Sequence, residues 1–464
     1  MRLLYLIVLL MLNSFCTIGQ ISFSKSKVLE DLKSLKEVLE ESHYDLYAYT
    51  TKKDFDATYD IVKNKIQQDA QQDSLTLLAV TNLFQQLVSI VNNGHTYIDF
   101  PVQPYFEYAQ ARGTLFPLEI TFENCKAYVR KNWSRDSTIE IGAEIQSING
   151  KFIDELVTQI YPYISAERPY FKKAKIEFYS FPRYYWQAFG QQDIFNVRIK
   201  QKGIVKNYTL EAINVISEFE TQRTEIFNAP RKFEFLDSAV YLNPGPFSGD
   251  ESQFRAFIDS TFMAINRQKS PNLIIDLRNN TGGNDSHSNY LVSYLADKPF
   301  KWCADFTLKT SKALKDFTRK NNDTTTTYFQ QILARKDGKI YAPNLGFYQP
   351  QISSKRYKGK VYVLVNRQSI SQATVTAAQI QDYNWGTIVG EETGEYPSLY
   401  ASIFPYVLPN TGITVYISKG QIIRVNGSKK QEGVIPDILI KDHLIDEKDE
   451  ILKGLLEKIK GGHK

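Results

Sequence analysis

The chain of 464 residues is longer than one hydrophobic core usually holds, which predicts two or three packed units. Its content of 42% apolar, 13% aromatic and 23% charged residues excludes a globally disordered chain. The formal charge of +5 comes from 56 basic and 51 acidic residues without a long block of like charge, so no nucleic-acid partner is expected.

The first residues have the pattern of a secretory signal peptide. Arg2 precedes an apolar run over residues 3–12 that is short for a bilayer span. Small residues before Gln20 predict cleavage there, so residues 1–19 are expected to be removed. An uncleaved membrane anchor is the alternative. We expect an exported protein, periplasmic or extracellular, with no stable membrane span after cleavage.

Residues 20–100 are predicted to form an N-terminal helical unit. Apolar residues recur there at steps of three and four, as in a helix with one buried face. The last of these helices is expected to start at Asp73 or Ser74 and to end at residues 93–94, where glycine tolerates a left-handed cap. His95 would then follow directly after a rigid helix end.

Residues 101–215 are dominated by strand-like segments, such as 118–122 and 195–199. Residues 141–151 contain an Asn-Gly turn and resemble the strand, tight turn and helix of a PDZ domain. We therefore expect a PDZ-like β domain, with another kind of β insert as the alternative.

Residues 216–445 alternate between strand and helix patterns, which predicts an α/β catalytic core. Residues 446–464 are expected to form a C-terminal helix or tail. The predicted helices and strands of the core are helix 252–266, strand 272–276, strand 361–365, helix 373–383 and strand 387–390.

Two segments of this core combine residues that suit acyl transfer. A serine at the start of a helix, Ser371, has an exposed hydroxyl, and the nearby Gln372 amide can stabilise a developing oxyanion. The Gly282-Gly283 turn supplies further backbone N–H groups that no side chain shields. The alternative for Ser371 is an ordinary helix cap.

These segments resemble the tail-specific, or C-terminal-processing, serine proteases, which include the tricorn core. The resemblance is carried by Asp276-Leu277-Arg278-Asn279-Asn280-Thr281-Gly282-Gly283, Ser369-Ile370-Ser371, Val389-Gly390-Glu391-Glu392-Thr393 and Gly433-Val434-Ile435-Pro436-Asp437. It implies a crotonase/ClpP-like spiral core and a serine endopeptidase that acts on unfolded or C-terminal peptides. It implies neither a metal nor an organic cofactor.

One branch of the family uses a lysine as base, but Tyr396 occupies the position in register. The tricorn-like branch uses a histidine instead, and His95 within Asn93-Gly94-His95-Thr96-Tyr97 resembles that element. A neutral imidazole accepts the serine proton at physiological pH without special tuning. By the same resemblance Glu432 is the expected carboxylate of a triad, with an exposed loop glutamate as the alternative, and Asp382 is ranked below it.

Other assignments stay open at this point. A ligand- or peptide-binding protein without catalysis, another hydrolase and a crotonase-type acyl-transfer enzyme are alternatives on the same fold. Arg278 is expected to pair with Asp276 or another acid rather than with substrate. The sequence leaves open the oligomeric state and whether Cys125 and Cys303 pair.

Overall fold

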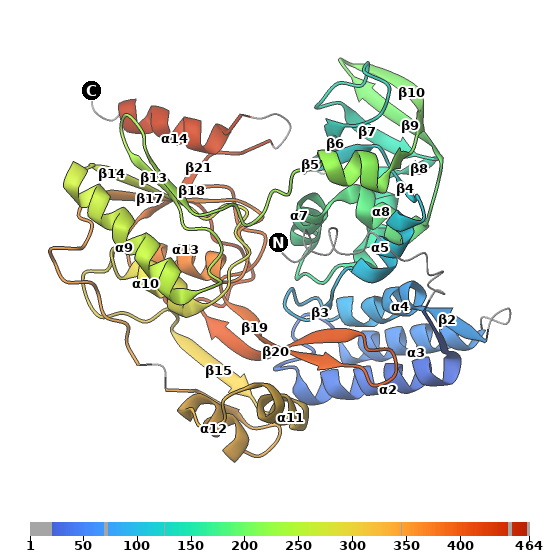
Figure 1. Cartoon of the computed structure of the whole chain (residues 1–464), viewed down its shortest axis with the longest axis horizontal. Coiled ribbons are helices and arrows are strands. Elements are labelled where there is room, and N and C mark those ends of the chain that lie inside the picture. The colour runs from blue at the N-terminus through green and yellow to red at the C-terminus, as the bar shows by residue number, and fades with distance from the viewer. Residues whose placement is uncertain (1–20, 69–72, 125, 345, 444–447, 462–464) are drawn as a thin grey trace, which may run out of the picture.

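The computed structural model describes residues 21–68, 73–124, 126–344, 346–443 and 448–461 (Figure 1). The predicted signal peptide and Cys125 lie outside these ranges, and Cys303 is buried. In the described part of the chain, no helix combines the length and apolar character needed to cross a membrane.

The core sheet has the strand order β12-β13-β14-β17-β18-β21. Strand β12 is antiparallel to β13, and all other neighbours are parallel. The bounds are Lys232–Phe235 (β12), Val240–Asn243 (β13), Asn272–Asp276 (β14), Lys360–Val365 (β17), Thr387–Gly390 (β18) and Ile438–Leu439 (β21). The predicted mixed α/β core is confirmed, and the three predicted core strands lie side by side at its centre.

Helices cover both faces of the core sheet, as Figure 1 shows. Leu273 and Ile275 of β14 pack in one cluster with α9, α10 and α13, whereas Ile274 packs against α14. Side chains alternate between the faces of a strand, so burial on both faces explains the continuous apolar run. The helix bounds are Glu251–Gln268 (α9), Asp285–Val292 (α10), Gln372–Asp382 (α13) and Glu450–Gly461 (α14).

The parallel pairing of β14 with β17 places the two candidate motifs together. Asp276 is opposite Leu364 in the register, so both strands end at the same edge of the sheet. In parallel α/β sheets, the loops beyond the carboxyl ends of the strands form the usual site. Residues 277–284 and 366–371 therefore leave the sheet side by side.

Residues 101–215, called the middle region here, contain a second sheet of order β10-β9-β7-β6-β5, with β8 beside β7. Asn149 (φ 49°) and Gly150 (φ 80°) form the predicted tight turn, and helix α6 follows. The PDZ-like character of the region stays a prediction. Its strands are Thr114–Leu115 (β4), Leu118–Glu123 (β5), Lys126–Asn132 (β6), Glu144–Ile148 (β7), Lys151–Phe152 (β8), Ile194–Gln201 (β9), Ile204–Glu211 (β10) and Ile213–Asn214 (β11).

The middle region holds more helix than its sequence pattern suggested. Helix α7 lies on the side of this region that faces the core sheet (Figure 1). The helices are Val102–Gln110 (α5), Ile153–Ile160 (α6), Pro169–Tyr179 (α7) and Phe181–Phe189 (α8), and a short helical segment, Val215–Glu220, leads out of the region.

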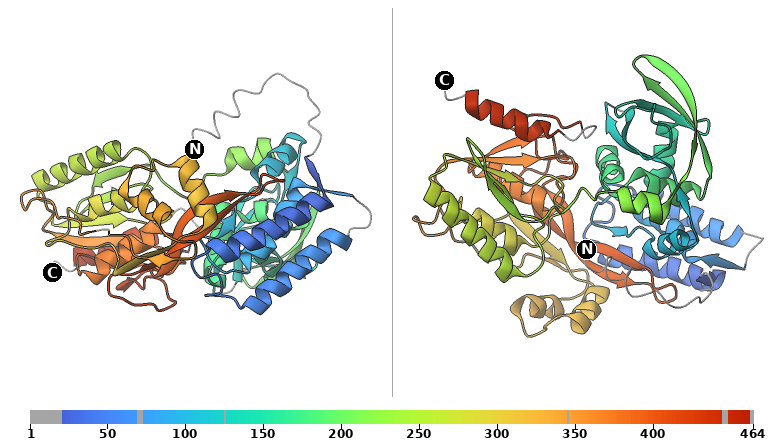
Figure 2. Two further views of the ribbon diagram at one scale, coloured as in Figure 1. Left: turned by 90° about the horizontal axis from the view of Figure 1, so that it is seen from below. Right: turned by 45° about the horizontal axis from the view of Figure 1, so that its top comes forward.

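The N-terminal helices share a hydrophobic cluster with later parts of the chain rather than having one of their own. Leu39 and Val88 belong to the same cluster as Leu308, Phe404 and Val415. Strand β3 pairs with β20, and Figure 2 shows the β19–β20 hairpin extending from the core to these helices. The elements are Ser22–Ser24 (β1), Lys25–Ser42 (α2), Lys52–Gln68 (α3), Ser74–Thr76 (β2), Leu77–Ser89 (α4), Tyr97–Ile98 (β3), Asp305–Lys309 (β15), Lys312–Asn321 (α11), Thr327–Ala334 (α12), Ile340–Tyr341 (β16), Leu399–Val407 (β19) and Thr414–Ile423 (β20).

The ends of α4 differ from the prediction. Ser74 belongs to strand β2, and the helix is capped by Thr76, whose hydroxyl accepts from Ala79 N–H at 3.2 Å. At the other end the left-handed residue is Asn92 (φ 52°), not Gly94. The loop that carries His95 nevertheless follows this helix directly, as expected.

Candidate active site

Ser371 lies between the end of β17 and the first turn of α13 in a strained backbone conformation. Its φ of 56° and ψ of −125° match the first central residue of a type II′ turn, which residues other than glycine rarely adopt. Ser369 holds this loop, because its hydroxyl donates to Leu277 O at 2.8 Å and accepts from Asn366 N–H at 3.1 Å. The Ser371 hydroxyl is thus fixed at the start of the helix.

The structure brings His95 to Ser371 across 276 positions of sequence. His95 Nε2 and Ser371 Oγ are 3.0 Å apart, which is hydrogen-bond distance. Thr96 next to it is anchored to Asn93, whose side-chain oxygen accepts from the Thr96 hydroxyl at 2.9 Å and from Ser418 Oγ at 2.7 Å. In the neutral tautomer with hydrogen on Nδ1, Nε2 accepts the serine hydrogen.

The carboxylate beside His95 belongs to Glu395, which no step of the sequence reasoning selected. Glu395 Oε1 lies 3.0 Å from His95 Nδ1 as an ion-pair contact in which the ring N–H is not fully aligned with the oxygen. Its other oxygen, Oε2, accepts a hydrogen bond from Ser371 N–H. The Glu395 side chain is fully buried. One carboxylate therefore contacts both the base and the backbone of the nucleophile.

The charges of this pair alter both pKa values. Burial by itself lowers the pKa of His95, but the adjacent Glu395 carboxylate outweighs it, and the His95 pKa is raised above 6.5. Burial by itself raises the pKa of Glu395, but His95 and the Ser371 N–H outweigh it, so this pKa is lowered. The pair favours an ionised carboxylate beside an imidazole that readily accepts a proton.

Glu432 does not take the position expected of it. Its side chain is 44% exposed, and its ion-pair contact is with Lys430 at 3.7 Å. Asp382, the lower-ranked candidate, pairs with Arg424 at 2.6 Å. The expectation for Glu432 is thus corrected, because the buried position beside the imidazole is occupied by Glu395 from the loop after β18.

The Gly282-Gly283 turn lies against the nucleophile, as expected. A Cβ atom added to Gly282 would lie 2.5 Å from Gln372 N and 2.8 Å from Ser371 Cβ. The Gly282 N–H donates to Asn280 Oδ1 at 2.8 Å, so this amide is already engaged. In the described residues, no acceptor is bonded to the backbone N–H of Gly283 or Gln372. These two amides remain the oxyanion candidates, and Gly282 contributes close packing instead.

Arg278 pairs within the core rather than facing an open site. It contacts Asp276 at 2.7 Å and Asp449 at 2.6 Å, in agreement with the expected structural ion pair. Tyr396 is buried, with the Arg168 guanidinium 5.1 Å from its ring centroid. Among the residues that the structure describes, no group of three or more His, Cys, Asp or Glu side chains is arranged to hold a metal ion.

A sequence signal for Glu395 existed, but it was weak. Glu395 lies two residues after Thr393, which is the last residue of a segment that carries the family resemblance. It also directly precedes Tyr396, which occupies the position of the family lysine. Proximity in sequence to a known base position could have suggested it. Only the packing shows that this glutamate is buried and that Glu432 is exposed.

Comparisons with known proteins concern the core of the chain and its overall fold. Residues 241–440 match the family model described as Peptidase family S41. The tail-specific protease of Haemophilus influenzae is 26% identical over 199 residues, which cover 41% of this chain and 23% of that protein. The match thus spans less than a quarter of the relative's length.

Among solved structures, mature CPAF superposes with a TM-score of 0.65 at 14% sequence identity, covering 94% of this chain and 96% of that chain. Mature CPAF complexed with lactacystin gives a TM-score of 0.61 at 14% identity, covering 94% and 97%. At this identity the likeness shows a shared fold alone. The core of this chain, residues 241–440, is therefore similar to peptidase family S41, and its motifs resemble those of the tail-specific, C-terminal-processing proteases.

Proposed function

We propose that this protein is an exported serine endopeptidase that hydrolyses unfolded or C-terminal peptides, with Ser371 as nucleophile, His95 as base and Glu395 as the orienting carboxylate. The observation that carries the proposal is the chain of contacts from Ser371 Oγ to His95 Nε2 and from His95 Nδ1 to Glu395 Oε1, each 3.0 Å long. Nucleophile, base and orienting group in this order are the arrangement of serine hydrolases on several unrelated folds.

The mechanism follows from these positions. His95 Nε2 takes the hydroxyl proton while Ser371 Oγ bonds to the carbonyl carbon, whose oxygen becomes an oxyanion. The N–H groups of Gly283 and Gln372 support that negative charge, and Glu395 stabilises the imidazolium. His95 then donates its proton to the departing amine, and the acyl-enzyme remains. A water molecule, deprotonated by His95, releases the acid product and restores Ser371.

Peptide is the substrate that the family assignment favours, and an extended segment can add as a strand to an exposed sheet edge. Strand β10 is an edge strand of the middle sheet, and Ile204 on it is 70% exposed. Export rests on the N-terminal pattern. A mature protein that starts at Gln20 in the extracytoplasmic fraction would support it, whereas an intact chain retained in the cytoplasm would contradict it.

A fluorophosphonate probe tests the catalytic proposal directly, because it reacts with an activated serine. We expect labelling of the wild-type protein at neutral pH and its loss in Ser371→Ala and His95→Ala. Hydrolysis of unstructured peptides, but not of acyl thioesters, should depend on the same residues. Absence of labelling and of peptide turnover in a folded wild-type protein would overturn the proposal in favour of a ligand-binding protein.

A further inference from the structure

One aromatic side chain of the middle region packs where the three triad loops meet. Phe171 of α7 is fully buried. A Cβ atom added to Gly94 would lie 3.0 Å from its ring, and one added to Gly394 would lie 2.7 Å from it. Ile370 packs against the small cluster of Phe171, Ala166 and Ala174. Gly94, Ile370 and Gly394 are the residues that directly precede His95, Ser371 and Glu395.

Two charged side chains of the middle region bind the backbone just before His95. Glu167 Oε1 accepts from Gly94 N–H at 2.7 Å and from the Asn93 side-chain amide at 3.2 Å. Lys175 Nζ donates to Gly94 O at 3.2 Å and to Ser165 O at 2.7 Å. Side chains of the middle region therefore hold the peptide groups on both sides of Gly94, although the loop itself continues from the N-terminal helices.

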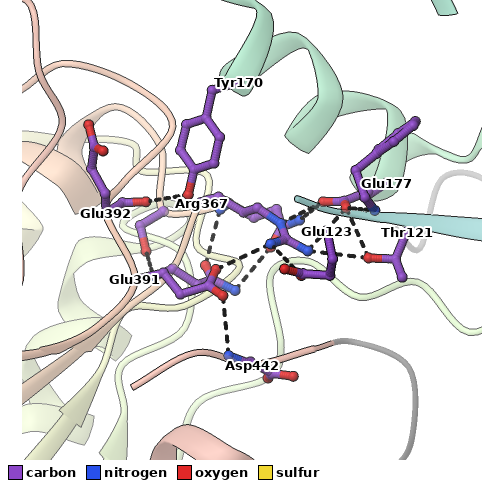
Figure 3. A network of polar contacts seen from close by, with 12 residues as sticks. Thr121, Glu123, Tyr170, Glu177, Arg367, Glu391, Glu392 and Asp442 are labelled. Atoms are coloured by element: carbon purple, nitrogen blue, oxygen red, sulfur yellow. Dashed lines mark hydrogen bonds and ion pairs between the residues drawn. The ribbon is translucent and has the colours of Figure 1, made fainter. Parts of the chain in front are cut away.

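Arg168, the residue that follows Glu167, holds the loop before Glu395 in a similar way. Arg168 Nε donates to Gly394 O at 3.0 Å, and Arg168 Nη2 donates to Thr393 O at 2.7 Å. Tyr170 OH donates to Glu392 O at 3.0 Å, which Figure 3 shows. Adjacent residues of one segment thus bind the loops of both the base and the carboxylate.

We propose that Phe171, Glu167 and Arg168 are positioning residues, which align His95 and Glu395 with Ser371 when the middle region is packed on the core. The inference rests on the proposed function and adds that the middle region completes the active site in addition to any role in binding peptide. The physical reason is that a displacement of about 1 Å in a catalytic group can cost roughly 10²-fold in rate.

The bonds of Glu167 and Arg168 are not needed merely to hold the middle region on the core, because a separate set of ion pairs already joins these two parts of the chain. Arg367 Nε donates to Glu177 Oε2 at 2.8 Å, and its Nη1 donates to Glu123 Oε1 at 2.9 Å (Figure 3). These ion pairs hold the middle region on the core without Glu167. The contacts of Glu167 and Phe171 instead reach the backbone immediately beside the catalytic groups.

The first arm of the test compares Phe171→Leu with Phe178→Leu in the full chain. Phe178 is a matched control, because it is also fully buried in α7 but stacks on Phe227 with ring centroids 4.6 Å apart. Peptide turnover, probe labelling and Tm are measured for both. We expect Phe171→Leu to lose about 10- to 100-fold in kcat with little change in KM, since misplaced groups slow the chemical step. We expect Phe178→Leu to keep its kcat within about two-fold for a similar loss of Tm.

The second arm uses a readout that does not require activity. Glu167 lies close enough to raise the His95 pKa, and Lys175 lowers it, although burial and Glu395 have larger effects. Burial and the charge of Glu395 raise the pKa of Glu167 itself, so its charge acts on His95 in the pH range where Glu167 is ionised. Glu167→Gln keeps an acceptor for Gly94 N–H and removes that charge. NMR titration of the His95 ring should give a lower pKa in Glu167→Gln and a higher one in Lys175→Met, with Lys173→Met of the same helix as control.

The outcomes separate this inference from the proposed function. An inert wild-type protein would defeat the proposed function, and the NMR arm would still decide whether Glu167 and Lys175 act on His95. If the wild-type protein is active while Phe171→Leu and Phe178→Leu lose kcat equally, the positioning role is wrong. An unchanged His95 titration in both charge variants would overturn the part of the inference that places Glu167 next to the base.

Discussion

At the scale of single residues, Glu395 determines the electrostatics of the site because both of its oxygens are engaged. Oε1 lies 3.0 Å from His95 Nδ1, and Oε2 accepts from Ser371 N–H. A fully buried carboxylate needs such partners, because an unpaired charge in the interior is strongly disfavoured. In the proposed mechanism, the same contacts would stabilise the imidazolium that forms when Ser371 loses its proton.

Substitutions of Glu395 and of Glu432 test which of these two carboxylates acts together with His95. Glu395→Gln removes the charge and should slow probe labelling and peptide turnover by roughly 10²- to 10⁴-fold, as for the orienting carboxylate of other serine triads. Glu432→Gln, at an exposed position, should leave both rates within about two-fold. Equal losses in the two variants would show that Glu395 has no special role.

The raised pKa of His95 predicts where activity falls in acid. The base must be neutral, so kcat/KM should rise with pH through the imidazole pKa, with its midpoint above 6.5 in the wild-type protein. Because Glu395 stabilises the charged ring, Glu395→Gln should move this midpoint to lower pH. The pH–rate profiles of the two proteins are the measurement, and a midpoint that moves upward would contradict the assignment.

At the scale of elements, the site depends on two loops that leave neighbouring parallel strands. The loop after β14 carries Gly282, and the loop after β17 carries Ser371. Gly282 has a φ of 84° and lies so close to Gln372 N that no side chain fits without movement. A glycine is required here both for its backbone conformation and for the close approach.

Gly282→Ala should therefore lose most activity, and Gly338→Ala is the matched control. Both positions have positive φ, at 84° and 75°, but an added Cβ meets no atom within 4 Å at Gly338. The backbone strain should cost about 1 kcal/mol of unfolding free energy in each. Gly282→Ala should in addition displace the oxyanion amides and lower kcat at least about 10-fold. Comparable kcat values in the two variants would argue against this packing role.

At the scale of the whole molecule, a buried cluster of charges joins the middle region to the core. Arg367, four residues before Ser371, contacts Glu177, Glu123 and Glu391, which come from three different segments (Figure 3). One guanidinium thus faces three carboxylates. Burial raises the pKa of Glu391 to about 7, although Arg367 opposes this shift.

The Glu391 pKa predicts how stability depends on pH. The folded protein retains a proton that the unfolded chain releases near pH 4.5, so this contribution to stability is lost as pH rises through about 7. Glu391→Gln cannot ionise and should be more stable relative to the wild type at pH 8 than at pH 5. Thermal unfolding across this range measures the difference, and a constant or reversed difference would refute the prediction.

Much of the fold could be read from the sequence because its signals are local. The apolar strands 272–276 and 361–365 and the turn at Asn149-Gly150 are visible in short segments, and each lies where it was predicted. Helix α7 could not be predicted in this way, since its buried residues follow no clean helical stripe. Phe171 packs with Ile370 of the core, whereas Ile176 packs in the cluster of the middle region itself. The start of α4 was misplaced because β2 takes up the expected capping residue.

The sequence by itself determined which kinds of side chain are available as nucleophile and base, because Ser371 and His95 lie in motifs that suit acyl transfer. The tertiary structure decided which carboxylate lies beside His95. A motif describes neighbours along the chain, whereas the orientation and burial of a side chain depend on residues that packing brings together. For that reason Glu395 lies beside the imidazole, Glu432 stays exposed, and α7 of the middle region reaches the loops of all three triad residues.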